Sequence, residues 1–175
     1  MLLVVSACNP KNQEEKLKNF VESRSHKITQ SITVGDVAIV SRFLPQAYRL
    51  LMGRSGDSMV SEGDRFFYFD VKFSKNGNFR PEKEKLLYLN FDMGNNFVLF
   101  VNNRDSIAPV FCQKIESGIS KEYEYMVVFE KKTDEKWRDF TLIYNDKIFS
   151  MGTVAFVYNE KDILKIPGIK EKELK

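Results

Sequence analysis

Apolar and polar residues alternate in several short segments of the chain. In residues 65–73, "RFFYFDVKF", the apolar set begins at Phe67 and the set on the other face begins at Tyr68. The same alternation recurs in residues 85–91, 123–129, 140–144 and 153–158. A period of two places alternate side chains on opposite faces, so each segment is predicted to be a β-strand with one covered face.

Two further segments predict strands by a different pattern. Residues 96–101, "NFVLFV", are almost continuously apolar, as in a central strand covered on both faces. Residues 31–40, "SITVGDVAIV", resemble one strand interrupted at Gly35 and Asp36, where we expect a bulge or a tight turn. Between the apolar runs lie typical turn residues, such as Asn76-Gly77 and Asn145-Asp146.

One short helix is expected. In residues 44–53, "LPQAYRLLMG", Pro45 stands near a helix start and Gly53 at a helix stop. Such a segment would connect one sheet edge to the other. The sequence as a whole therefore predicts a mainly β chain, an antiparallel β-sandwich of about seven or eight strands with one connector helix, in a single domain over residues 28–168.

The charge pattern argues against nucleic-acid binding. The 175 residues contain 27 Lys plus Arg and 24 Asp plus Glu, a net charge of +3. Basic residues are interspersed with acidic ones in residues 81–87, 129–137 and 169–175. Mixed signs are typical of solvated turns and, for residues 169–175, of a charged tail. We expect no nucleic-acid partner.

The start of the chain suggests an export signal. Val5-Ser6-Ala7-Cys8 resembles the lipobox of bacterial lipoproteins, in which the cysteine is acylated and becomes the mature N-terminus. Residues 1–7 would then be the end of a signal peptide, truncated because no Lys or Arg precedes Cys8. Residues 8–27 would be the lipidated cysteine and a flexible tether. The alternative is that residues 2–7 form a buried strand.

A resemblance extends this interpretation. The order "FFYFDVKFSKNG", "GISKEYEYMVVFEKK" and "FTLIYNDKIFSMG" resembles the immunoglobulin-like domain of small bacterial lipoproteins described as telomeric-repeat-binding-factor-like. The similarity covers roughly residues 30–158 and includes the lipobox. It implies an immunoglobulin-like sandwich, lipid-anchored in a bacterial cell envelope and facing the periplasm or the exterior. It brings no catalytic or ligand-binding residues.

The residues needed for the common catalytic sites are scarce. Cys112, between apolar neighbours, and His26, the one histidine, lie far apart in sequence, which disfavours a nucleophile–base pair or a zinc site. Residues 53–64 are glycine-rich but lack a phosphate-binding motif. Oxygen ligands for calcium occur in two sets, Asp92, Asn95 and Asn96 or Asn103 and Asp105, without the spacing of a known loop. We expect no enzyme, cofactor or metal.

Recognition is the function that remains. Tyr and Arg dominate interface energetics, which makes the following residues candidates for partner binding: Tyr48, Arg49, Met52 and Arg54 in or after the connector, and Tyr68 and Tyr88 on solvent-facing positions. The alternative is that Leu50, Leu51 and Met52 plug one end of the sandwich under Tyr48. The leading hypothesis is a membrane-anchored, non-catalytic module for a protein or glycan partner. An accessory envelope subunit that adds a strand at a sheet edge, or a hydrolase using scattered carboxylates, remains an alternative.

Overall fold

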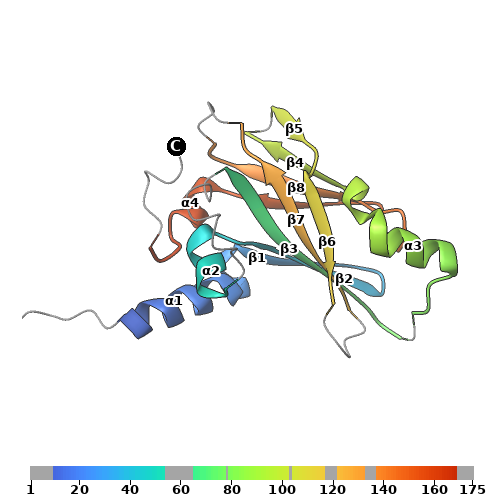
Figure 1. The fold of residues 1–175 in the computed structure, drawn as a ribbon, viewed down its shortest axis with the longest axis horizontal. Coiled ribbons are helices and arrows are strands. Elements are labelled where there is room, and N and C mark those ends of the chain that lie inside the picture. Colours follow the sequence, from blue (N-terminus) through green and yellow to red (C-terminus); the bar gives the residue numbers. More distant parts are fainter. Residues whose placement is uncertain are drawn as a thin grey trace, which may run out of the picture.

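The computed structural model describes residues 10–53, 65–77, 79–102, 104–116, 122–132 and 137–168. Nine strands in these ranges form two antiparallel sheets packed face to face (Figure 1). The first sheet has the order β1 (Thr29–Val34), β2 (Val37–Phe43), β3 (Phe66–Lys75), β7 (Tyr123–Glu130), β6 (Phe111–Ile115). The second has the order β5 (Asp105–Ile107), β4 (Phe97–Val101), β8 (Phe140–Asn145), β9 (Thr153–Tyr158). The expected β-sandwich is confirmed.

The connections follow a recognisable scheme. Strands β2-β3-β7-β6 face β5-β4-β8-β9, and the chain crosses between the sheets after β3, β5 and β7. Immunoglobulin-type sandwiches have strands A, B, E and D opposite C, F and G, an order that β2-β3-β7-β6 and β4-β8-β9 follow, with β5 as an extra strand beside β4. Strand β1 is an addition that pairs with β2 at the edge of the first sheet. A strand order describes a fold and carries no function.

The core lies between the sheets and is rich in aromatic rings. The inward faces are those that the alternation predicts: Phe67, Phe69, Val71 and Phe73 of β3 are buried, as are the alternate residues of β8 and β9. The rings of Phe69 and Phe140 lie 5.7 Å apart across the two sheets. Ser41 of β2 and the Tyr158 hydroxyl of β9 share a buried hydrogen bond of 2.7 Å. This bond satisfies two polar groups inside an apolar layer.

The predicted strand at residues 85–91 is wrong. Lys83–Phe91 forms helix α3, followed by a 3₁₀ turn, η3, at Met93–Asn96. Leu89 and Met93, four residues apart, are buried, whereas Leu87 and Phe91 are exposed. The alternation of Leu87, Leu89 and Phe91 indicates a strand, but Leu89 and Met93 have the spacing of one helix face, and in a run this short periodicity alone does not separate the two.

The expected tether is also corrected where the structure describes it. Pro10–Glu22 forms helix α1, followed by a 3₁₀ turn, η1, at Arg24–His26. Leu17 and Val21 are buried in the core, and Phe20 packs against it. These residues follow helical spacing, a signal hidden within a charged run. Residues 1–9, with Cys8, and the tail 169–175 lie outside the described residues.

Smaller expectations are refined as well. Gly35, at φ +60°, makes a tight turn, so residues 31–40 belong to the hairpin β1–β2 rather than to one strand. Strand β4 buries alternate residues and leaves Val98 and Phe100 half-buried, so it is covered fully on one face only. The connector helix is confirmed as α2 (Gln46–Leu51), and α4 (Glu160–Ile163) follows β9. Within the described ranges no helix has the length and apolarity to cross a bilayer.

Candidate functional site

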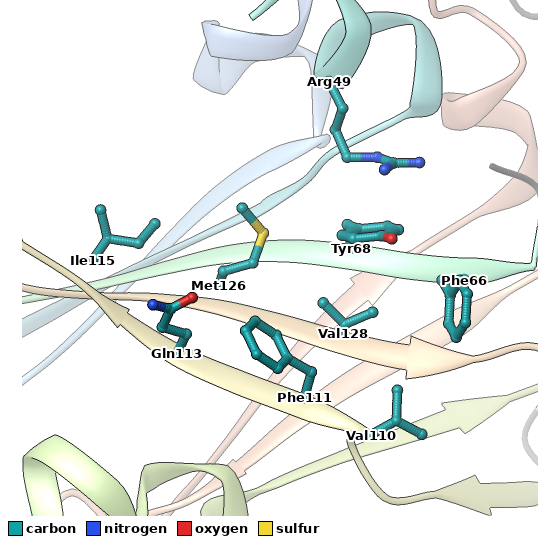
Figure 2. A pocket seen from close by; sticks show the side chains of 9 residues that line it. All are labelled: Arg49, Phe66, Tyr68, Val110, Phe111, Gln113, Ile115, Met126 and Val128. Carbon is teal, nitrogen blue, oxygen red and sulfur yellow. The ribbon is translucent and has the colours of Figure 1, made fainter. Parts of the chain in front are cut away.

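An apolar groove of about 460 Å³ lies on the outer face of the first sheet. Figure 2 shows its side chains rising from β3, β7 and β6 toward α2. We refer to it as the sheet groove. Its lining consists of Arg49, Phe66, Tyr68, Val110, Phe111, Gln113, Ile115, Met126 and Val128. The volume is within the range of ordinary ligand sites, about 300–1,000 Å³.

The strand register explains the apolar floor. Val128 of β7 pairs with Tyr68 of β3 on one side and with Phe111 of β6 on the other. Two residues along the strands, Met126 is paired in the same way with Gln113 of β6. Because residues in register share a face, the outward sets of three strands converge into one surface. These sets are mostly apolar at this end, so the floor presents hydrophobic side chains to solvent.

Helix α2 supplies the wall. The guanidinium of Arg49 lies 3.6 Å from the centre of the Tyr68 ring, and Figure 2 shows it extending over that ring. Arg49 is only 4% exposed, and this burial lowers its pKa, an effect that its interaction with Tyr68 partly offsets. Since an arginine keeps its proton in proteins, the groove has a cation beside an aromatic face at one end.

Ion pairs border the sheet groove on the outer face of the first sheet. Nη1 of Arg42 in β2 lies 3.6 Å from Oδ2 of Asp70 in β3, and Asp70 is two residues after Tyr68. Farther along, Lys72 contacts two carboxylates of the β7 side, Glu122 at 3.2 Å and Glu124 at 3.5 Å. The outer face is therefore divided into an apolar half, which is hollowed, and a charged half.

A second hollow, of about 390 Å³, lies beside β6 next to η3, and it shares Val110 and Phe111 with the sheet groove. Strand β6 is the last of its sheet and, among the described strands, pairs with β7. Cys112 faces this hollow, and burial raises the pKa of its thiol to about 11. A thiol with that pKa is protonated at neutral pH and is a poor nucleophile.

The structure brings together two of the residues that the sequence proposed, Arg49 and Tyr68. Tyr48 is instead buried, and its hydroxyl donates a hydrogen bond of 2.9 Å to Glu22 of α1. Met52 is exposed at the end of α2. Tyr88 lies on α3, where its hydroxyl donates to Asn96. Arg54 lies outside the described residues.

Sequence reasoning missed most of the floor. Residues 111–115, "FCQKI", were not identified as a strand, although Phe111, Gln113 and Ile115 alternate as the outward face of one. Met126 and Val128 occupy the outward positions of a strand that was predicted. Their alternation with buried residues was available as a signal, but their meeting with β6 depends on pairing that a single sequence does not show.

The lining of the sheet groove is mostly apolar. Among the described residues that line the sheet groove, the polar groups are Arg49, Gln113 and the Tyr68 hydroxyl, and none is a carboxylate, histidine or cysteine. In the part of the chain that the structure describes, no three His, Cys, Asp or Glu residues gather as metal ligands do. The arrangement can desolvate apolar side chains and orient them beside one cation.

No family model and no curated protein matches the chain. Two solved structures are similar to it at 9% sequence identity. A DUF4426 family protein from Pseudomonas aeruginosa PAO1 has a TM-score of 0.42, over 76% of this chain and 93% of that one. A protein of unknown function from Burkholderia pseudomallei K96243 has a TM-score of 0.45, over 100% of both chains. Both TM-scores are below 0.5, so we derive no function from these bacterial structures.

Proposed function

We propose that the protein is a lipid-anchored, non-catalytic binding module of a bacterial envelope, and that its sheet groove holds an apolar segment of a partner protein. The sheet groove is the observation that carries this proposal. Phe111 is 48% exposed on an edge strand, and it adjoins Val110, which is also exposed. Exposed apolar side chains that gather in a hollow are typical of interaction sites.

The lining favours a protein over a glycan. Sugars need several polar partners for their hydroxyl groups, and the groove offers three polar groups, on Arg49, Gln113 and Tyr68, against six apolar side chains. Apolar side chains of a partner would instead be desolvated there, at about 25 cal/mol for each Å² buried. Arg49 and Tyr68 belong to the residue types that contribute most to such interfaces.

The anchor is proposed from the sequence around Cys8. The lipobox-like Val5-Ser6-Ala7-Cys8 stands directly before α1, which begins at Pro10. The mass of the N-terminal peptide from the native membrane fraction tests this part. We expect a lipid-bearing peptide that begins at Cys8. An unmodified peptide that begins at Met1, from protein found outside the membrane fraction, would rule out the anchor.

Capture from solubilised native membranes tests the groove. Phe111→Ser removes an exposed ring from the floor, whereas Val157→Ser alters an equally exposed apolar residue, also 48%, on β9 of the other sheet. We expect Phe111→Ser to lower the recovery of a stoichiometric partner at least tenfold, about 1.4 kcal/mol. Val157→Ser should leave recovery unchanged. Equal recovery with both variants would exclude the groove as the binding site.

A second candidate function follows from β6 being an edge strand. An accessory subunit could receive an added strand of a larger assembly beside Phe111, where the backbone is at the sheet edge. At the other end, Lys114 donates a 3.0 Å hydrogen bond to Asn90 of α3, which partly closes that edge. Hydrogen exchange separates the two candidates, because an added strand would slow the exchange of β6 amides, whereas side-chain docking in the groove would not.

A further inference from the structure

Helix α2 contributes to a third hollow, of about 740 Å³, on the side of α1. Leu17 of α1 and Ala47, Leu50 and Leu51 of α2 supply its apolar surface. Its polar margin consists of Gln13, Glu14 and Lys16 of α1. This α1–α2 hollow shares no lining residue with the sheet groove, to which α2 contributes Arg49.

Helix α1 packs firmly against the sandwich. Leu17 and Val21 are buried, and the Thr29 hydroxyl donates a 2.6 Å hydrogen bond to the carbonyl of Val21. The Tyr48 hydroxyl joins α2 to Glu22 at the end of α1. Because α1 is packed against the sandwich, its orientation relative to a membrane would also be that of the whole domain.

The attachment point lies close to the hollow. Only Asn9 separates Cys8 from Pro10, the first residue of α1, so the anchor reaches at most about 7 Å from the helix start. Leu17 stands seven residues further, about 10 Å along the helix axis. A lipid on Cys8 would therefore keep Leu17 within about 17 Å of the anchored cysteine, near enough for the hollow to reach the membrane surface when α1 lies along it.

From this placement we propose that the α1–α2 hollow is the face on which the anchored protein rests on the bilayer, with Leu50 at the boundary between headgroups and acyl chains. The proposal rests on the lipid anchor proposed above. Leu50 is 44% exposed, and Met52, the C-cap residue directly after α2, is also exposed. Apolar side chains on a surface helix are the groups that partition into this boundary.

The proposed membrane contact depends on apolar side chains and not on charge. Helix α1, "PKNQEEKLKNFVE", carries three lysines and three glutamates, so it has no net attraction to anionic lipids. One or two exposed apolar side chains bind a bilayer weakly by themselves. A covalent anchor overcomes this weakness because it makes the second contact intramolecular. The anchored protein should therefore contact neutral lipid, whereas the chain without an anchor should not.

Fluorescence quenching in vesicles tests the proposal. The chain from Cys8, with Cys112→Ser and Trp137→Phe, is coupled through Cys8 to a maleimide lipid in phosphatidylcholine vesicles with brominated acyl chains. Leu50→Trp is compared with Leu87→Trp, because Leu87 is 49% exposed on α3 at the other end of the molecule (Figure 1). We expect at least about twofold stronger quenching at position 50 than at position 87. Equal quenching, or none at position 50, would overturn the proposal.

A second measurement keeps the buried Trp137 and needs no introduced tryptophan. Hydroxyl-radical footprinting of the coupled chain, with only Cys112→Ser, should show that coupling to vesicles protects Leu50 and Met52 and leaves Leu87 and Phe91 unchanged. Protection of all four, or of none, would contradict the proposal. Because the coupling is chemical, these results do not depend on whether the cell lipidates Cys8, which the mass of the N-terminal peptide decides separately.

Discussion

The guanidinium of Arg49 lies 3.6 Å above the ring of Tyr68, and this stack joins the connector helix α2 to the first sheet. The backbone amide of Leu44, just before α2, donates a 2.9 Å hydrogen bond to the carbonyl of the same tyrosine. Tyr68 therefore fixes the entry to α2 through its backbone and the cation of α2 through its ring. The wall of the sheet groove depends on this residue.

A double-mutant cycle measures the stack. Arg49→Met and Tyr68→Leu each remove one partner and keep apolar contact, and urea unfolding gives the free energy of each variant. We expect a coupling energy of about 0.5–2 kcal/mol, the range of cation–π pairs that are partly desolvated. Strictly additive effects would show that the stack contributes nothing to the stability of the fold.

Tyr48 illustrates a residue whose substitution reports on stability. Tyr48→Ala removes a buried ring and should lower the free energy of unfolding by about 3–5 kcal/mol. Tyr48→Phe removes only the hydrogen bond to Glu22 and should cost about 0.5–1.5 kcal/mol. Thermal or urea unfolding checks both values. A Tyr48→Ala variant as stable as the parent would contradict the observed packing and return Tyr48 to the binding candidates.

Asp146 organises the turn between β8 and β9. Its carboxylate accepts hydrogen bonds from the Tyr144 hydroxyl at 2.8 Å and from the amides of Ile148, Phe149 and Met151 at 2.7–3.0 Å. Burial alone would raise the pKa of Asp146, but these donors outweigh it, and the pKa is lowered. Asp146→Asn should therefore lower the free energy of unfolding by about 1–3 kcal/mol at pH 7.

The same carboxylate makes stability depend on pH. A pKa lowered by folding stabilises the native state fully above the unfolded value, about 3.9, and this contribution is lost as pH falls through the folded pKa. Urea unfolding from pH 7 to pH 2.5 should show the gap between the parent and Asp146→Asn narrowing below about pH 4. A gap that stays constant with pH would mean that the charge of Asp146 has no part in the turn.

The thiol of Cys112 should be unreactive. With a pKa of about 11, its thiolate fraction at pH 8 is about two orders of magnitude below that of a free cysteine. In a Cys8→Ser chain, native Cys112 should react with a disulfide reagent at least about 100-fold more slowly than it does in urea, and the rate should rise up to about pH 11. Fast labelling of the folded chain at pH 8 would contradict this environment.

Period-two alternation was sufficient to predict the two-layer β architecture, because strands such as β8 and β9 bury one face cleanly. It failed at Lys83–Phe91, where a strand-like alternation and a helical spacing coincide, and the buried pair Leu89 and Met93 shows the helix. It also missed α1, because Leu17 and Val21 are surrounded by charged residues. The pattern of apolar residues predicts most elements. Where a segment fits both the period of a strand and that of a helix, packing against the rest of the protein decides which one forms.

The site was less accessible to the sequence. Arg49 and Tyr68 could be proposed because aromatic and arginine side chains at exposed positions suggest binding. The floor could not be proposed, because Phe111 meets Val128 only through the pairing of β6 with β7. A groove made by three strands is a property of register, which one sequence without relatives does not specify.

Site-specific photo-crosslinking in the native envelope tests the central claim most directly. A photoreactive amino acid replaces Gln113, which is exposed at the groove floor, or Val157, which is exposed on β9. We predict that Gln113 crosslinks to one protein partner, that Phe111→Ser abolishes this product, and that position 157 yields none of it. The same product from both positions, or a product at position 113 that Phe111→Ser leaves unchanged, would contradict binding in the sheet groove.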